Sequence, residues 1–190
     1  MSRLQRWGKE AIRRLRHRRI RRRKERAVRK YLAWYSLRIL IETGTYRGDM
    51  VEAMKRSFDR IYSIELDPIL FEKARLRFKD TTHVSILHGD SGEALARLLP
   101  GIHEPVLFWL DAHYSEGDTA RGKRETPIVN EIGSILSHPV KRHVILIDDA
   151  RCFAGENDYP TVEEIVRMTR TVLPDAVVEV RDDIIRIYPG

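Results

Sequence analysis

Cysteine is nearly absent from this 190-residue sequence, in which Cys152 stands alone. A single cysteine excludes an internal disulfide framework and suits a reducing compartment. Long hydrophobic runs are missing too: no apolar stretch is long enough to span a bilayer, and no signal-peptide segment precedes a cleavage site. We therefore expect a cytoplasmic protein. Its length suffices for one domain with a full core plus an extension.

Positive charge is concentrated at the N-terminus. Residues 1–30 hold 15 of the 35 lysines and arginines but only two of the 28 acids, which leaves 20 basic and 26 acidic residues for the rest of the chain. We predict a basic arm, helical or disordered, over residues 1–30 and a mildly acidic domain over residues 31–190 that folds without it. A cationic helix suits an anionic membrane surface, which would make the protein peripheral there, or nucleic acid. The alternative is a solvated tail without a specific partner.

Apolar strand-like segments alternate with helical segments from residue 37 onward. This alternation predicts an α/β fold with a doubly wound, Rossmann-like sheet of about seven strands. Only the short turn Asp182-Asp183 separates the last two segments, and such a turn joins antiparallel strands, so one antiparallel strand is expected near the C-terminal end. We expect strands at residues 37–42, 60–64, 84–87, 106–110, 143–147, 176–180 and 184–188, and helices at 49–57, 69–79, 91–99, 127–137 and 161–173.

Acidic residues follow the predicted strands at the points where the strands end. Ligands of such sheets bind beyond the carboxyl ends of the parallel strands, and the packing of a core does not place carboxylates there. This clustering is the strongest functional signal in the sequence. The acids are Glu42, Glu65, Asp90, Asp111, Asp148 and Asp149.

The first strand leads into a turn that contains Gly44 and Gly48, and a helix is expected to begin at Asp49. Such a turn lets a ligand approach the backbone closely and meet free N–H groups of the helix. The phosphate-binding pattern G-x-x-x-x-G-K-[ST] is absent, and the two glycines do not complete G-x-G-x-x-G. An acidic rim would also repel a pyrophosphate. A ligand with a ribose, an adenine and a positive centre fits this edge better.

The segment Glu42-Thr-Gly-Thr-Tyr-Arg-Gly48 resembles motif I, E-x-G-x-x-x-G, of the class I S-adenosylmethionine-dependent methyltransferases. An acid at the end of strand two and an antiparallel last strand are similar to that family as well. The resemblance covers about residues 37–190. It implies S-adenosylmethionine as the cofactor and methyl transfer as the activity.

The resemblance also implies roles for the residues around the cofactor. Glu42 would orient the loop or meet the cofactor's amino group, and Glu65 would accept both ribose hydroxyls, with a solvated strand-end acid as the alternative. Asp90 would accept from the adenine amino group, unless it is only a helix cap. The full predicted cofactor set is Glu42, Gly44, Thr45, Tyr46, Gly48, Glu65, Asp90, Ser91 and Asp111.

Asp111, Asp148 and Asp149 form a second group of carboxylates after strands four and five. Their mutual repulsion calls for a cation or for protons. The arrangement is similar to the metal-dependent O-methyltransferases of the catechol and macrocin types, which implies that these three acids hold Mg²⁺ and that the ion activates an acceptor hydroxyl. In the alternative, Asp111 positions the cofactor and the other two cap the following loop.

The predicted catalytic residues are His113, Asp111 and Tyr114. The lysine that serves as general base in the catechol type has no counterpart after Asp111, so His113 is the candidate base, with Tyr114 behind it. The alternative for His113 is a loop residue that caps or packs. The sequence Asp111-Ala-His113-Tyr114 also lacks the Asn/Asp-Pro-Pro-aromatic tetrapeptide usual in base N-methylation.

Three functions are compatible with these patterns. The first is O-methylation of a small-molecule or saccharide hydroxyl with the help of a divalent metal. The second is an RNA methyltransferase that the basic arm recruits to its substrate. The third is a binding module that keeps the fold without turnover, although such a module has no need of the complete acid series.

Overall fold

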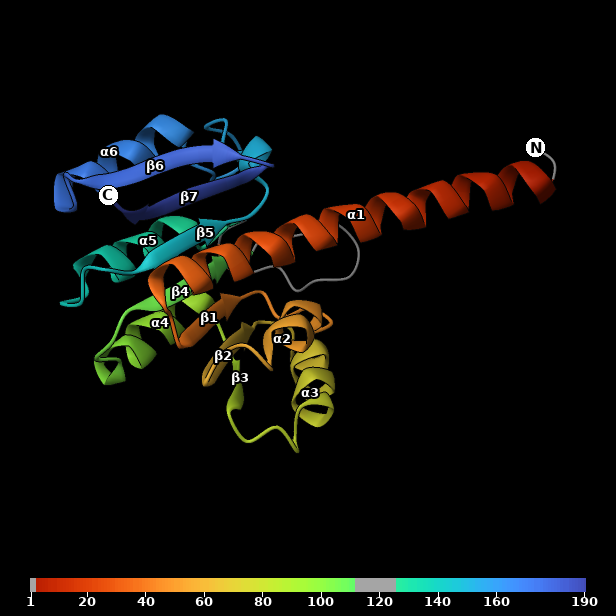
Figure 1. Cartoon of the computed structure of the whole chain (residues 1–190), viewed down its shortest axis with the longest axis horizontal. Helices are drawn as coiled ribbons and strands as arrows, with labels where there is room; N and C mark the ends of the chain where they lie inside the picture. The colour runs from red at the N-terminus through yellow and green to blue at the C-terminus, as the bar shows by residue number, and fades with distance from the viewer. Residues whose placement is uncertain (1–2, 112–125) are drawn as a thin grey trace.

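The computed structural model describes residues 3–111 and 126–190, with side chains described at residue 15 and from residue 17 onward within these ranges. Seven strands form one sheet in the order β3-β2-β1-β4-β5-β7-β6, which confirms the predicted α/β fold (Figure 1). Every predicted strand is present, and its ends shift by two residues at most. The strands are β1 (Ile39–Thr43), β2 (Arg60–Glu65), β3 (Val84–His88), β4 (Val106–Leu110), β5 (Val144–Ile147), β6 (Ala176–Arg181) and β7 (Ile184–Pro189).

The strand directions follow from the connections. β1 pairs in parallel with β2 on one side and β4 on the other, and β7 pairs antiparallel with both β5 and β6. The turn between β6 and β7 consists of Asp182 and Asp183 at φ of 56° and 65°. Two left-handed residues are typical of tight two-residue hairpins. The predicted single antiparallel strand is therefore β7.

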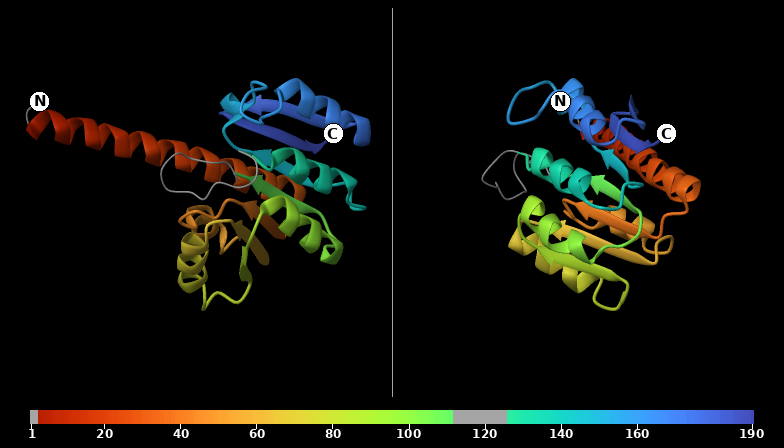
Figure 2. Two further views of the ribbon diagram at one scale, coloured as in Figure 1. Left: turned by 180° about the vertical axis from the view of Figure 1, so that it is seen from behind. Right: turned by 90° about the vertical axis from the view of Figure 1, so that its left-hand side faces the viewer.

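Helices α4, α5 and α6 pack on one face of the sheet and α1 and α2 on the other, so the sheet lies between layers of helices (Figure 2). Ile39 and Ile41 of β1 point into the core beneath α4, α5 and α6, and Leu40 points into the core beneath α1 and α2. Every residue of β1 and β4 is buried, because helices cover the sheet on both sides. The helices are α1 (Arg3–Tyr35), α2 (Asp49–Met54), α3 (Pro68–Arg77), α4 (Ser91–Leu98), α5 (Ile128–Ser137) and α6 (Val162–Val172).

Helix α1 is continuous through the predicted boundary between arm and domain. Its C-terminal part packs on the sheet, where Val28 and Tyr31 are fully buried and the Tyr35 hydroxyl donates to the Pro189 carbonyl at 2.8 Å. Residues 17–23 are exposed, and this half of the helix extends beyond the body of the protein (Figure 1). Val28 belongs to the core, so the core includes part of the basic segment, and folding of the domain without residues 1–30 stays a prediction.

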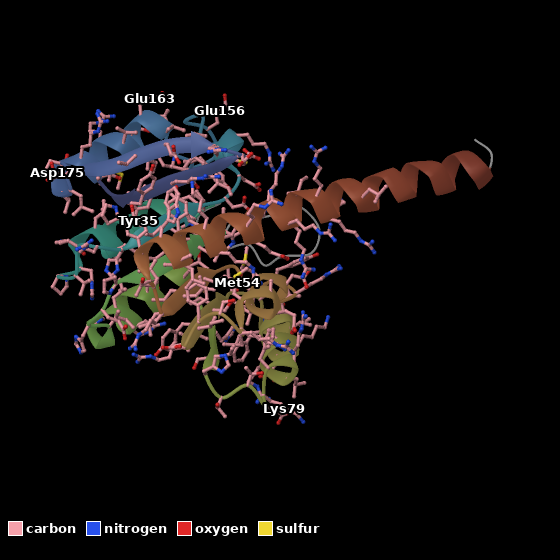
Figure 3. All side chains as sticks on the ribbon, viewed as in Figure 1. Tyr35, Met54, Lys79, Glu156, Glu163 and Asp175 are labelled. Atoms are coloured by element: carbon pink, nitrogen blue, oxygen red, sulfur yellow. The ribbon has the colours of Figure 1, made fainter. Side chains whose placement is uncertain are left out.

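Side chains of α1 and α2 share one core. Met54 of α2 is fully buried there, whereas the labelled charged residues Lys79, Glu156 and Glu163 lie on the outer surface (Figure 3). Within residues 3–111 and 126–190, no helix has both the length and the apolarity that crossing a bilayer requires.

Candidate active site

The loop after β1 has a left-handed backbone at three positions. Gly44, Tyr46 and Gly48 have φ of 81°, 49° and 72°. The N–H groups of Gly44 and Thr45 both donate to the Ile64 carbonyl of β2, at 2.9 and 3.2 Å, which ties the loop to the neighbouring strand. A Cβ on Gly48 would stand 2.6 Å from Cε2 of Phe78, so this position needs glycine both for its φ and for space.

Glu42 lies inside the protein beneath this loop. The Ser63 hydroxyl donates to the Glu42 carboxylate, and the Thr45 hydroxyl lies 2.6 Å from the Ser63 hydroxyl. Burial raises the pKa of Glu42 to about 8, against the opposing effect of the Ser63 hydrogen bond. Glu42 was predicted either to orient the loop or to meet the cofactor's amino group, and this arrangement supports the first role. Ser63 was not singled out from the sequence, where one polar residue in an apolar strand is the only signal.

Glu65 is held by two backbone donors. Its Oε2 accepts from the Tyr46 N–H at 2.6 Å, and its Oε1 accepts from the Asp67 N–H at 2.9 Å. The residue is only 5% exposed, so it is not a solvated strand-end acid. Each carboxylate oxygen has a second lone pair, which leaves acceptor capacity for ribose hydroxyls.

Asp90 caps helix α4, as its alternative interpretation predicts. One carboxylate oxygen accepts from the Glu93 N–H at 3.1 Å. Ser91 is buried beside it. The cap uses one oxygen of Asp90 and leaves the other available, so a role toward adenine stays a prediction.

Glu131 of α5 is a buried acid that the sequence analysis missed. It is 1% exposed, and neither of its oxygens has a hydrogen bond of normal geometry from a described residue. Burial raises its pKa to about 7, while the nearby hydroxyls of Ser91 and Thr43 act in the opposite direction. Glu131 occurs at helical spacing with Ile128, Ile132 and Ile135, and an acid within an apolar stripe was the available signal.

The three aspartates after β4 and β5 meet at one point. Asp111, Asp148 and Asp149 each offer a carboxylate oxygen within 4.8 Å of the others, and we call this group the acidic cluster. The backbone brings them together, because the Asp111 N–H donates to Thr43 of β1 and the Asp148 N–H donates to Leu110 of β4, both at 3.0 Å. Three carboxylate oxygens are a donor set that suits a hard divalent ion such as Mg²⁺.

The members of the acidic cluster differ in their surroundings. Asp148 is 3% exposed, and burial raises its pKa. Asp149 has a left-handed backbone with φ of 54°, and its Oδ1 pairs with Arg151 at 2.8 Å. The Lys24 side chain of α1 pairs with the Asp148 carboxylate. Lys24 was not predicted, because nothing in the sequence distinguishes it within a run of basic residues.

Two predicted catalytic residues, His113 and Tyr114, lie outside the described residues. Asp111 is described and half-buried. The carboxyl edge of the sheet thus brings together the glycine loop, Glu65, Asp90 and the acidic cluster, as expected from the strand order.

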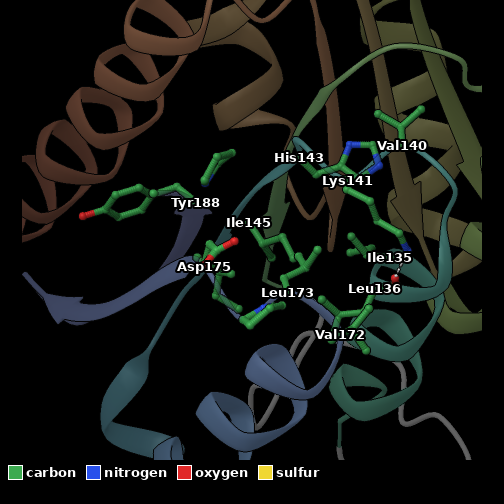
Figure 4. A pocket seen from close by; sticks show the side chains of 15 residues that line it. Ile135, Leu136, Val140, Lys141, His143, Ile145, Val172, Leu173, Asp175 and Tyr188 are labelled. Carbon is green, nitrogen blue, oxygen red and sulfur yellow. Dashed lines mark hydrogen bonds between the residues drawn. The ribbon is translucent and has the colours of Figure 1, made fainter.

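A separate cavity of about 200 Å³ lies at the opposite end of the sheet (Figure 4). Apolar side chains such as Ile145 and Leu173 line most of it, together with Lys141, Asp175 and His143. It contains none of the predicted site residues. The geometry of the acids, and not this cavity, therefore locates the candidate active site.

No family model and no curated protein sequence matches the chain. Several solved structures resemble it. The O-methyltransferase TomG from Streptomyces achromogenes, involved in tomaymycin synthesis and in complex with SAM, is 16% identical with a TM-score of 0.60, covering 87% of this chain and 79% of that one. An O-methyltransferase from Bacillus cereus in complex with SAH is 16% identical with a TM-score of 0.58, covering 86% and 80%.

A third structure carries a different activity. The N-methyltransferase NodS from Bradyrhizobium japonicum WM9 is 15% identical with a TM-score of 0.57, covering 90% of this chain and 96% of that one. At such identities the likeness concerns the fold and not the acceptor. This chain has the fold of the class I S-adenosylmethionine-dependent methyltransferases.

Proposed function

We propose that this chain is an S-adenosylmethionine-dependent methyltransferase that methylates a hydroxyl of a small molecule or saccharide, with a divalent metal in the acidic cluster. One observation carries the proposal: the glycine loop clamped by Glu65 and the acidic cluster lie at the same edge of one sheet, on neighbouring strands. The glycine loop with Glu65 suits a cofactor with a ribose and a positive sulfur. The acidic cluster suits activation of an acceptor oxygen.

Different residues of the site would bind different parts of the cofactor. The left-handed turn at Gly44 and Gly48 exposes backbone for the methionine part, and Glu65 has acceptor capacity for the ribose. We assign Asp90 and Ser91 to the adenine. Structural neighbours with SAM or SAH in their complexes support this cofactor.

The reaction forms a bond between the acceptor oxygen and the methyl carbon and breaks the bond from that carbon to sulfur, whose electron pair stays on sulfur. The acceptor's proton must pass to a base, and His113 is our candidate. A divalent ion bound by the acidic cluster would lower the pKa of the acceptor hydroxyl. The in-line geometry of the transfer makes positioning by the rigid strand ends important for the rate.

A thermal-shift experiment with S-adenosylhomocysteine tests the cofactor site. Ligand at about 100 times its dissociation constant should stabilise the protein by roughly 2.7 kcal/mol, a rise in melting temperature of about 5–11 °C. Glu65→Ala should abolish the rise, and Glu72→Ala, which removes an exposed acid on α3, should retain it. No rise in the folded wild type would contradict the methyltransferase proposal and favour a binding module of another kind.

A second candidate, an RNA methyltransferase, is supported by the course of α1. The helix passes the acidic cluster at Lys24 and carries exposed residues 17–23, most of them basic, outward from the same edge. Deletion of residues 1–20 leaves the buried part of α1 in place. Methylation of RNA should collapse in this variant, whereas methylation of a small molecule should survive.

A further inference from the structure

Lys24 of α1 contacts the acidic cluster, although it is distant in sequence from Asp111, Asp148 and Asp149. Its ammonium pairs with Oδ2 of Asp148, and the exposed fractions of the two side chains are 26% and 1%. Burial lowers the pKa of Lys24, but the charges of Asp111, Asp148 and Asp149 together raise it above its ordinary value. The lysine is thus a cation that pairs with Asp148 and is also stabilised by the charges of Asp111 and Asp149.

The helix holds Lys24 in this position from both sides. One turn before it, Arg21 pairs with Asp49 of α2 at 3.1 Å. One turn after it, Val28 is fully buried, and Arg29 donates to the Ser57 hydroxyl at 2.8 Å and to the Ala53 carbonyl at 2.5 Å. The contact with Asp148 is therefore part of the docking of α1 on the body, and not the chance position of a surface side chain.

An ammonium and a divalent ion compete for the same oxygens. Mg²⁺ binds carboxylate oxygens at about 2.0–2.1 Å and needs a near-octahedral shell. The Lys24 ammonium contacts Oδ2 of Asp148, and its charge would repel an ion bound to the same carboxylate. The two cations therefore compete for the Asp148 carboxylate.

Arg151 pairs with Asp149 at the rim of the cluster. We propose that the Lys24 ammonium is the resident cation at Asp148 and that a divalent ion binds the acidic cluster only when this ammonium leaves Asp148. Docking of α1 and metal loading are then mutually exclusive at Asp148, so the N-terminal helix regulates the metal site. The inference rests on the proposed function for its use in catalysis, but the competition between the two cations does not depend on methyl transfer.

Binding of Mn²⁺ to the full-length protein, followed by electron paramagnetic resonance with Mg²⁺ as competitor, tests the proposal. Lys24→Gln should bind Mn²⁺ at least tenfold more tightly than the wild type. Lys30→Gln is the matched control on the same helix, since the Lys30 ammonium lies 3.8 Å from the centre of the Trp34 ring. This control should bind Mn²⁺ as the wild type does.

A double variant separates the cluster from other Mn²⁺ sites. Lys24→Gln combined with Asp148→Asn should lose the gained affinity and should also recover stability, because it removes the buried charge that Lys24 neutralised. If Lys24→Gln alone folds poorly, Mn²⁺ should raise its melting temperature more than that of the wild type. Equal affinity in wild type and Lys24→Gln, or no binding by Lys24→Gln, would overturn the proposal.

The failure of the proposed function has a different signature. If no S-adenosylhomocysteine shift occurs but Lys24→Gln gains Mn²⁺ affinity, the methyltransferase proposal is wrong and the competition stands. If the cofactor shift occurs and Mn²⁺ affinity is unchanged in Lys24→Gln, the competition proposal is wrong and the methyltransferase proposal stands.

Discussion

The backbone N–H of Tyr46 donates a 2.6 Å hydrogen bond to the carboxylate of Glu65, across 19 residues of sequence. This bond joins the glycine loop after β1 to the end of β2. The acid predicted to hold the ribose therefore also fixes the shape of the loop that would pass the methionine part. Under the proposed function, one side chain would serve both cofactor binding and loop order.

Glu65→Gln tests this coupling. The two oxygens of Glu65 accept from the backbone N–H groups of Tyr46 and Asp67. In glutamine one of these oxygens is replaced by an NH₂ group, which cannot accept, so one of the two hydrogen bonds is lost. Loss of a hydrogen bond to a charged acceptor costs about 1–3 kcal/mol. We expect a decrease of that size in the free energy of unfolding measured in urea, together with weaker S-adenosylhomocysteine binding by calorimetry. Unchanged stability would show that Glu65 does not order the loop.

Gly48→Ala should be more costly than a usual glycine replacement. The added Cβ meets Cε2 of buried Phe78 at 2.6 Å, and the backbone is left-handed at φ of 72°. We expect a loss of roughly 2–4 kcal/mol in the free energy of unfolding. Gly133→Ala is the control, because it lies in α5 with open space around its Cβ and should gain about 0.5–1 kcal/mol from helix propensity. Equal effects of the two variants would refute the steric argument.

The fold was predictable because the central strands are short apolar runs that end at an acid, and the other strands are short segments rich in apolar residues. Buried strands such as β4 read as continuous apolar segments, and their carboxyl ends place Glu65, Asp111 and Asp148 at one edge without further information. The hairpin was predictable because only Asp182 and Asp183 separate its two strands.

The remaining site residues depend on tertiary packing. Lys24 has many basic neighbours in sequence, and only the docking of α1 selects it for Asp148. The boundary at residue 30 followed the change in charge, but the core includes Ala27 and Val28, which are inside the basic segment. Charge composition and burial are different properties, and here they change at different residues.

A pair of buried histidines should make stability depend on pH. Val106 donates its N–H to Nδ1 of His143 at 3.1 Å, so the proton of His143 is on Nε2, which lies 3.0 Å from Nδ1 of His138. Burial, with the charges of His138 and Lys141, lowers the pKa of His143 to about 4. The folded state therefore resists protonation that the unfolded state, with a pKa near 6.5, accepts.

The sign follows from this difference. The contribution of His143 is complete above pH 6.5 and is lost as the pH falls toward 4, by about 1.4 kcal/mol per pH unit and roughly 3 kcal/mol in all. Burial of Glu42 and Glu131 changes stability in the opposite direction over the same interval, so the loss is measured as the difference between the wild type and His143→Gln in urea unfolding at pH 7.5 and pH 5. His143→Gln should lose less stability than the wild type over the same interval. A variant that follows the wild type at both pH values would exclude His143 as the origin.

Glu131 should produce the opposite dependence on pH. Burial raises its pKa from about 4.5 to about 7, so the folded state retains a proton that the unfolded state releases. Stability then decreases as the pH rises from 4.5 to 7, by roughly 3 kcal/mol at most.

Glu131→Gln keeps the size of the side chain and removes its ionisation. We expect the variant to be more stable than the wild type at pH 8 and to differ little from it near pH 4.5, as measured by urea unfolding. Glu163→Gln, on the exposed surface of α6, is the control and should change little at either pH. Glu131 lies beside Ser91 at the carboxyl edge of the sheet, so under the proposed function its charge should also matter for binding. If S-adenosylhomocysteine binds the variant and the wild type equally at pH 8, Glu131 contributes to stability alone.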